Sequence, residues 1–492
     1  MRTLSLACAA LLLFSLCVAA QDPANAALLS DKEAKNRVEG ARRMVQAGDK
    51  KSIKALLEAL VVERDGWAGR EMGLTLAELR GAEGLSAAEK EVLACKKPEE
   101  MFAAYWALNG LAQGGTPEAT ATLKFALEKG HKKDVSLRAC AFEAIGESGR
   151  TELAELVLAP VSNYKLEDDS GNVFENLAAI TAVRKLCPEG DDRAAQKPYL
   201  DALIRVLDHS QDDRIKYFAA LGLSRITGQP AYLSGSWWRD WLLNGQGGDG
   251  EAKQGKTVAF FDAIAVGTRV VFVIDISGSM EWPADMDFRR DPVTGKGKEG
   301  GPDYSQVKTK LDLAKVELLW TLQHLPEDYY FNIVVYSSEH RLIDEAETEL
   351  IQATEENKRK MSIHVLGLKA NGGTNIHGSL KRSFGVLRKG KLKDDPALDP
   401  KAMLEGADTI FFLTDGFPSW SDDSTAQGYV HPKWGSIGNG YYVQEDAILG
   451  DIARMNTFRK VVIHAIAVGK DAAHELMEKL AEQNHGKYVN RG

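Results

Sequence analysis

The chain has 492 residues, of which 44% are hydrophobic and 27% are charged, and its formal net charge is −9 at neutral pH. This length is sufficient for two or three globular domains with sizeable cores. The acidic balance disfavours nucleic acid as a partner, because the phosphate backbone attracts a basic surface.

A secretory signal is predicted at residues 1–20. Arg2 precedes an apolar run from Leu4 to Ala20 that ends in small residues, so cleavage is expected after Ala20. Lipoprotein processing at Cys17 and an uncleaved anchor are the alternatives. No later stretch is long and apolar enough to span a bilayer. The protein is therefore expected to be secreted, periplasmic or associated with the cell envelope.

Three cysteines follow the predicted signal, at Cys95, Cys140 and Cys187. Their odd number and wide spacing indicate neither a disulfide framework nor a zinc motif. Because all three lie in helical contexts, we expect them to be buried as small apolar side chains.

Residues 26–243 are rich in Ala, Leu, Glu and Lys at helical spacing. Three Ala-rich segments end in Gly110, Gly146 and Gly222, which are separated by 36 and then 76 positions. Because 76 is twice 38, this period is typical of two-helix units of about 40 residues. The region resembles degenerate HEAT-like repeats, which implies an all-α solenoid with a concave interaction surface. An irregular helical bundle is the alternative.

Residues 244–267 are predicted to form a linker and the entry to a second domain. Gly, Gln and charged residues dominate as far as Lys256, a composition typical of a flexible segment.

An alternating pattern of strands and helices follows. Val270 to Ile274 are β-branched or aromatic without polar alternation, which predicts a parallel strand buried on both faces. Further strands are predicted at 330–336, 340–343, 409–413, 461–468 and 487–489, and helices at 310–325, 355–365, 376–388, 444–455 and 474–483. This order predicts an α/β fold with a doubly wound, mainly parallel, Rossmann-like sheet.

Polar residues follow the first of these strands directly. Asp275, Ser277 and Ser279 lie at its carboxyl end, where open α/β sheets place ligand sites. A carboxylate and two hydroxyls form an oxygen cluster of low charge, which suits a hard cation such as Mg²⁺. Thr374 in a Gly-Gly-Thr-Asn segment, and Asp415 after a second apolar run, would supply further oxygens.

The order of these motifs resembles the metal-ion-dependent adhesion site of von Willebrand factor type A domains, in the bacterial form whose first loop reads Asp-x-Ser-Gly-Ser-Met. The resemblance covers residues 268–490. It implies that Mg²⁺ or Mn²⁺ is held by five residues: Asp275, Ser277, Ser279, Thr374 and Asp415. It also implies that the hydroxyls touch the metal directly, that the carboxylates act largely through water, and that a partner's Asp or Glu completes the coordination.

The sequence therefore predicts a secreted or envelope-associated binding or adhesion protein rather than an enzyme, with the helical repeats as a second interaction surface. His377 and His431 lie near the site, but the chain lacks zinc-ligand spacing, a nucleophile elbow and a phosphate-binding loop there. A hydrolase in which the same cation activates water is one alternative. An envelope scaffold with a structural metal is another.

Two insertions near the predicted site carry aromatic residues that would supply contact area for a partner. Packing of each insertion against its own domain is the alternative. The residues in question are Trp282, Trp420, Tyr429 and Trp434.

Overall fold

The computed structural model describes residues 23–97, 100–129, 135–170, 173–245, 258–285, 301–392, 396–397, 399–423, 428–431 and 435–491. The chain divides into two compact units, Met1–Lys253 and Gln254–Gly492. The predicted signal at residues 1–20 and most of the predicted linker lie outside the described residues.

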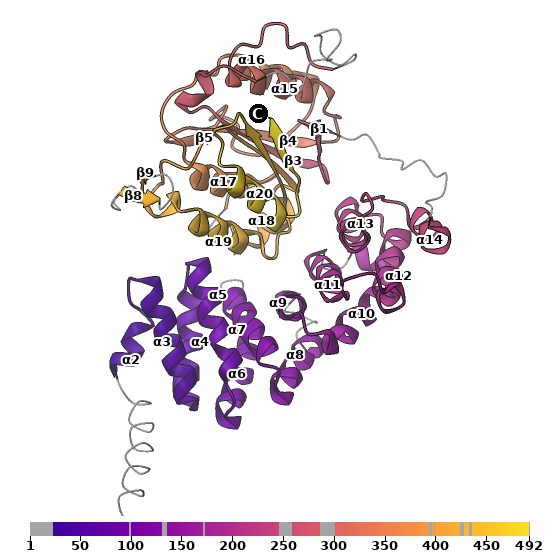
Figure 1. Ribbon diagram of the computed structural model, residues 1–492, viewed down its shortest axis with the longest axis vertical. Helices are drawn as coiled ribbons and strands as arrows, with labels where there is room; N and C mark the ends of the chain where they lie inside the picture. The colour runs from indigo at the N-terminus through magenta and orange to yellow at the C-terminus, as the bar shows by residue number, and fades with distance from the viewer. Residues whose placement is uncertain are drawn as a thin grey trace, which may run out of the picture. The chain divides into compact units, whose positions relative to one another are not determined.

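The first unit consists of helices stacked in two layers. The odd-numbered helices from α3 to α13 contact one another in sequence, while α4, α6 and α8, and then α10, α12 and α14, form the second layer (Figure 1). The helices are α2 (Pro23–Leu28), α3 (Ala34–Ala47), α4 (Lys50–Val62), α5 (Gly66–Leu74), α6 (Ala82–Ala94), α7 (Met101–Gly114), α8 (Pro117–Lys129), α9 (Val135–Ser148), α10 (Ala154–Ser162), α11 (Val173–Leu186), α12 (Arg193–His209), α13 (Asp213–Thr227) and α14 (Gly235–Asn244).

Aspartates define where several of these helices begin. The side chains of Asp49, Asp192 and Asp212 accept hydrogen bonds from backbone N–H groups in the first turns of α4, α12 and α13. These N–H groups have no partner within the helix, so each aspartate stabilises the start of its helix by about 1 kcal/mol.

Two of the three recurring glycines lie where helices of one layer approach closely. A Cβ atom added to Gly110 on α7 would lie 2.0 Å from the carbonyl oxygen of Gly73 on α5, and one added to Gly146 on α9 would lie 2.9 Å from Ala182 Cα on α11. At Gly222 the nearest atom to an added Cβ is instead Leu203 Cδ1 of α12, at 3.0 Å, so close approach within one layer accounts for two of the three glycines. The two-layer stack agrees with the predicted helical hairpins, and their assignment to HEAT-like repeats stays a prediction.

The three cysteines lie within this unit and form no disulfide with one another. Cys140 and Cys187 are buried as expected, whereas Cys95, which caps the end of α6, is only partly buried.

The second unit contains a seven-stranded sheet in the order β11-β10-β7-β3-β4-β5, with β6 also paired to β4. The pairs from β11 to β4 are parallel, whereas β5 and β6 are antiparallel. The strands are β3 (Arg269–Asp275), β4 (Tyr330–Tyr336), β5 (His340–Leu342), β6 (Ile351–Gln352), β7 (Thr409–Thr414), β10 (Val462–Val468) and β11 (Tyr488–Arg491). Two hairpins lie outside the sheet, β1 (Ala259–Phe260) with β2 (Ala263–Ile264), and β8 (Gly428–His431) with β9 (Gly435–Asn439).

Helices cover both faces of this sheet, which confirms the predicted doubly wound α/β fold. Helices α15 (Lys310–His324) and α16 (Glu355–Leu366) lie on one face, and α17 (Ile376–Phe384), α19 (Glu445–Asn456) and α20 (His474–Gln483) on the other (Figure 1). A short helix, α18 (Pro400–Glu405), precedes β7.

Helix α17 is shorter than predicted. The sequence pattern predicts helix as far as residue 388, but the helix ends at Phe384, before Gly385. Leu387 instead forms an isolated β-bridge with Gly406 and accepts a hydrogen bond from the backbone N–H of Leu350. Apolar spacing alone did not reveal this end, because Val386 and Leu387 remain buried in the bridged segment.

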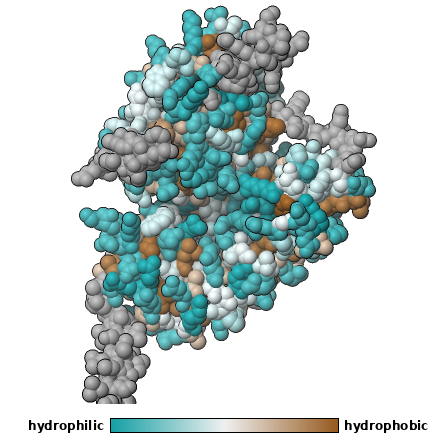
Figure 2. All heavy atoms as spheres, in the orientation of Figure 1, coloured by the Kyte–Doolittle hydropathy of each residue, from teal (hydrophilic) through white to brown (hydrophobic). Residues whose placement is uncertain are grey.

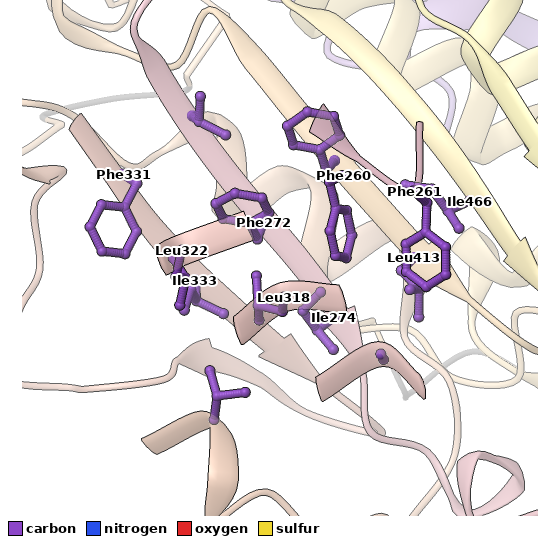
Figure 3. Close-up of a cluster of buried hydrophobic side chains, with 14 of the residues drawn as sticks. Phe260, Phe261, Phe272, Ile274, Leu318, Leu322, Phe331, Ile333, Leu413 and Ile466 are labelled. Carbon is purple, nitrogen blue, oxygen red and sulfur yellow. The ribbon is translucent and has the colours of Figure 1, made fainter. Parts of the chain in front are cut away.

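The core on the α15 face is built from aromatic and branched side chains. Phe272 of β3 and Phe411 of β7 stack with ring centroids 5.4 Å apart, and Phe260 of β1 contacts both rings edge-on. Figure 3 shows Leu318 and Leu322 of α15 directed toward the same cluster. Burial of these side chains, each contributing about 1.5–3 kcal/mol, fixes β3 at the centre of the sheet.

Hydrophilic side chains cover most of the visible surface of both units (Figure 2). Across the parts of the chain that the structure describes, no helix has the length and apolar character needed to cross a membrane.

Candidate functional site

Strand register brings the two predicted carboxylates to the same edge of the sheet. Ile274 of β3 pairs with Leu413 of β7, so Asp275 and Asp415 follow at the carboxyl ends of adjacent parallel strands. Both side chains are buried. The sheet thus joins two sequence motifs that are far apart in the chain.

Asp275 is held by one hydrogen bond to each carboxylate oxygen. Its Oδ1 accepts from the backbone N–H of Ser277 at 2.7 Å, and its Oδ2 accepts from Thr414 Oγ1 at 2.7 Å. Burial, followed by the nearby Asp415 carboxylate, raises the pKa of Asp275 to about 7. A cation close to this carboxylate would favour its ionised form.

A chain of hydroxyls connects the first loop to Asp415. Ser277 Oγ and Ser279 Oγ lie 3.2 Å apart, and Ser279 Oγ donates a hydrogen bond to Asp415 Oδ1 at 2.8 Å. The other oxygen of Asp415 accepts from Lys310 Nζ at 2.9 Å. Ser279 remains partly exposed, so this chain reaches the protein surface.

Thr374 reaches the same place from a third loop. The positions of Thr374 Oγ1 and Ser279 Oγ lie 3.5 and 3.8 Å from the point that a Cβ atom on Gly416 would occupy. The backbone N–H of Gly278 donates to the carbonyl of Gly372 at 3.0 Å, which ties the first loop to the Gly-Gly-Thr segment. All five predicted residues are therefore brought together.

The loop after β7 holds the Thr374 segment from the other side. The backbone N–H of Thr374 donates to Ser419 Oγ at 2.9 Å, and the backbone N–H of Ser419 donates to the Thr374 carbonyl at 2.9 Å. Next to Thr374, Asn375 Nδ2 donates to Asp422 Oδ1 at 2.7 Å. Hydrogen bonding to His340, together with that from Asn375, lowers the pKa of Asp422 to about 2.

The donor set has the chemistry of a site for a hard divalent cation. It combines two buried carboxylates with three hydroxyl groups, and oxygen ligands of this kind suit Mg²⁺ or Mn²⁺. No group of three His, Cys, Asp or Glu side chains that could hold a metal occurs among the described residues. A cation bound here would therefore depend on the hydroxyl ligands, and the assignment of these five residues as its ligands stays a prediction.

Sequence reasoning missed three residues that contact this site. Thr414 bonds Asp275, Lys310 pairs with Asp415, and Gly469 adjoins the ammonium group of Lys310. The only local signal was the position of Thr414 next to Asp415. Lys310 and Gly469 are distant from the motifs in sequence, so only the fold reveals them.

Of the two histidines near the motifs, only His377 has a side chain within the described part of the structure. His377 is buried, and its Nε2 lies 2.8 Å from Asp451 Oδ2 while its ring stacks on Tyr442. His431 belongs to β8, and its side chain lies outside the described part of the structure.

The predicted aromatic rim is described only in part. Trp282 is 53% exposed and Trp420 is half-buried. Trp434 and the side chain of Tyr429 lie outside the described residues.

Comparison with known proteins finds a family match within the second unit. Residues 303–490 match the family model described as von Willebrand factor type A domain. The chain is 24% identical over 217 residues to inter-alpha-trypsin inhibitor heavy chain H3 from Homo sapiens, and equally to that from Bos taurus; each match covers 44% of this chain and 18% of the relative. The chain thus spans less than a fifth of the length of these relatives.

Solved structures with similarity to the chain include a von Willebrand factor type A protein from Catenulispora acidiphila, with a TM-score of 0.30, 18% identity, and coverage of 46% of this chain and 40% of that one. The PilB minor pilin from Streptococcus sanguinis has a TM-score of 0.28 and 16% identity, with 45% and 56% of the two chains covered. The family match begins at residue 303, whereas β3, with Asp275 at its end, pairs with β4 and β7 inside the match.

Proposed function

Because residues 303–490 form a von Willebrand factor type A domain, we propose that this chain is a secreted or envelope-associated protein that binds a partner protein through a divalent cation. Mg²⁺ or Mn²⁺ would be held by Asp275, Ser277, Ser279, Thr374 and Asp415. An Asp or Glu carboxylate of the partner would complete its coordination, and the helical unit would provide a second interaction surface.

The observation that carries this proposal is the convergence of three hydroxyls and two carboxylates from three separate loops. The Ser279 hydroxyl donates its single hydrogen to Asp415 and lies 3.2 Å from the Ser277 hydroxyl, so one lone pair of its oxygen remains available to a cation. The bound cation would supply positive charge that attracts a carboxylate. Asp275, meanwhile, is fixed by Ser277 and Thr414, which keeps it in place when the cation binds or leaves.

The exposure and position of Trp282 support the proposal that this site binds a partner protein. Trp282 is 53% exposed, and it directly follows the short helix that contains Ser279. A large exposed aromatic beside a binding site provides contact area at low entropic cost, and such residues dominate many interfaces. We propose that it contacts the partner.

The proposed cation is tested first by calorimetric titration of the purified chain with Mn²⁺. We expect saturable binding at one site that EDTA abolishes. Thr374→Ala removes one hydroxyl ligand and should weaken binding at least tenfold. Ser362→Ala, which removes a hydroxyl bonded to Lys358 within α16, should leave binding unchanged. Equal affinity in all three proteins would contradict the assigned ligands.

The proposed partner is tested by affinity capture from the envelope and secreted fractions of the native organism. Capture is carried out with Mg²⁺, with EDTA, and with the Thr374→Ala variant in Mg²⁺. A protein retained only by the unmodified chain in Mg²⁺ supports binding through the cation. Equal recovery in all three samples would place the binding surface elsewhere and contradict the proposal.

A further inference from the structure

We infer that Lys310 is a fixed positive charge within the cation site and makes the loaded site selective for an anionic partner group. This inference rests on the proposed function, because it concerns the same five ligands. It assigns a role to a residue outside the sequence motifs.

A capping box places Lys310 at the first position of α15. Thr309 accepts a hydrogen bond from the backbone N–H of Asp312, and the Asp312 carboxylate accepts from the backbone N–H of Thr309. The backbone N–H of Lys310 also donates to the carbonyl of Trp282 at 2.9 Å. The helix therefore begins against the end of the first site loop, and the Lys310 side chain starts from a fixed point.

The ammonium group of Lys310 forms a buried ion pair with Asp415. Nζ lies 2.9 Å from Asp415 Oδ2, and the two side chains are 5% and 0% exposed. The other oxygen of this carboxylate, Oδ1, accepts a hydrogen bond from the Ser279 hydroxyl. Lys310 thus fixes the orientation in which Asp415 accepts from Ser279.

The ammonium group of Lys310 lies in a space that a side chain at position 469 would fill. Gly469 follows β10 with a φ of +89°, and a Cβ atom added there would lie 2.9 Å from Lys310 Nζ and 2.8 Å from its Cε. On another side, Nζ lies 5.1 Å from the centre of the Trp282 ring, within range of a cation–π interaction. A glycine, an aromatic ring and a carboxylate from three separate segments therefore surround one charge.

The positive charge of Lys310 changes the net charge of the site when a cation is bound. The two carboxylates alone would neutralise a divalent cation, whereas the additional ammonium leaves a net charge of one positive unit. In a buried site, charges a few ångströms apart interact strongly. Lys310 should therefore weaken cation binding and strengthen binding of the partner's carboxylate.

The test replaces Lys310 with methionine, which has a similar unbranched side chain without charge. Affinity for Mn²⁺ is measured by calorimetry at pH 8, and affinity for acetate is measured by the spectral change of the bound Mn²⁺ in electron paramagnetic resonance. We expect Lys310→Met to bind Mn²⁺ about tenfold more tightly and acetate several-fold more weakly. A side chain with only a structural role would not change the two affinities in opposite directions.

The matched control is Lys358→Met, since Lys358 is also buried in this unit but donates to the carbonyl of Leu325 on another part of the domain. It should change neither affinity. Lys310→Gln provides a second neutral side chain if the methionine variant does not fold, as judged by thermal melting.

Unchanged or weaker Mn²⁺ binding by the folded Lys310 variants would overturn the inference while leaving the proposed function intact. Unchanged acetate affinity would overturn it in the same way. Absence of Mn²⁺ binding by the unmodified chain would instead contradict the proposed function itself, and the inference with it.

Discussion

Ser279 and Asp415 are 136 positions apart in the sequence, yet the Ser279 hydroxyl donates a 2.8 Å hydrogen bond to the Asp415 carboxylate. The bond joins the loop after β3 to the loop after β7. It commits the only hydrogen of that hydroxyl, so its oxygen can only accept from Ser277 and keeps a second lone pair for a cation. A hydroxyl oriented in this way is a better cation ligand than one that rotates freely.

The raised pKa of Asp275 predicts a pH dependence of stability in the metal-free protein. A carboxyl group whose pKa rises from 3.8 to about 7 on folding contributes stability that is present below pH 3.8 and lost as the pH rises through 7. Asp275→Asn should remove this contribution. Its unfolding free energy, relative to that of the unmodified protein, should increase by a few kcal/mol from pH 4 to pH 7.

This difference is measured by chemical denaturation in EDTA at several pH values, because comparison with the variant cancels the other titrating groups. With Mg²⁺ present the trend should reverse for the unmodified protein, since the cation binds the ionised carboxylate. A constant difference between the two proteins across this pH range would contradict the prediction.

Thr414→Val should destabilise the second unit by about 1–3 kcal/mol, because it removes a buried hydrogen bond to Asp275 and leaves Oδ2 without that donor. Denaturation followed by tryptophan fluorescence measures the loss. Thr457→Val serves as control, since its hydroxyl bonds the Ala453 carbonyl on an exposed helix turn. Equal stability of both variants would show that the Thr414 hydroxyl does not stabilise the second unit.

Gly110→Ala should destabilise the helical unit by at least about 3 kcal/mol, because its Cβ atom would lie 2.0 Å from a backbone oxygen of α5 that cannot move aside easily. Gly81→Ala is the matched control. It caps α6 at a φ of −71°, and its nearest neighbour to an added Cβ lies at 3.7 Å. Far-ultraviolet circular dichroism during heating would distinguish them, and similar melting temperatures would refute the packing argument.

His464 should stay uncharged well below the usual pH for histidine. Burial lowers the pKa of His464 to about 4, while its Nδ1 accepts a hydrogen bond from the backbone N–H of Lys487 at 3.0 Å. A lowered histidine pKa contributes stability above pH 6.5 that is lost as the pH falls through 4. Nuclear magnetic resonance should show a neutral ring at pH 5, and a charged ring there would contradict this.

Local sequence patterns were sufficient to predict most strands and helices of the second unit. The uninterrupted apolar run from Val270 to Ile274 predicted a buried parallel strand, and α20 has the bounds that its apolar spacing predicted. The hairpin strands β8 and β9 and the short helix α18 were not predicted. Nor were the shortest strands, β1, β2 and β6. Each is only two residues long and exists because a neighbouring segment pairs with it.

The sequence by itself determined the α/β fold of the second unit, the helical character of the first, and the five residues proposed as cation ligands, because strand periodicity and the motifs that follow each strand are local properties. The tertiary structure decided what surrounds those ligands. Lys310, Thr414 and Gly469 reach the site only because α15 begins, and β7 and β10 end, at the same edge of one sheet. Their contacts depend on strand order and register, which no single segment of the chain encodes.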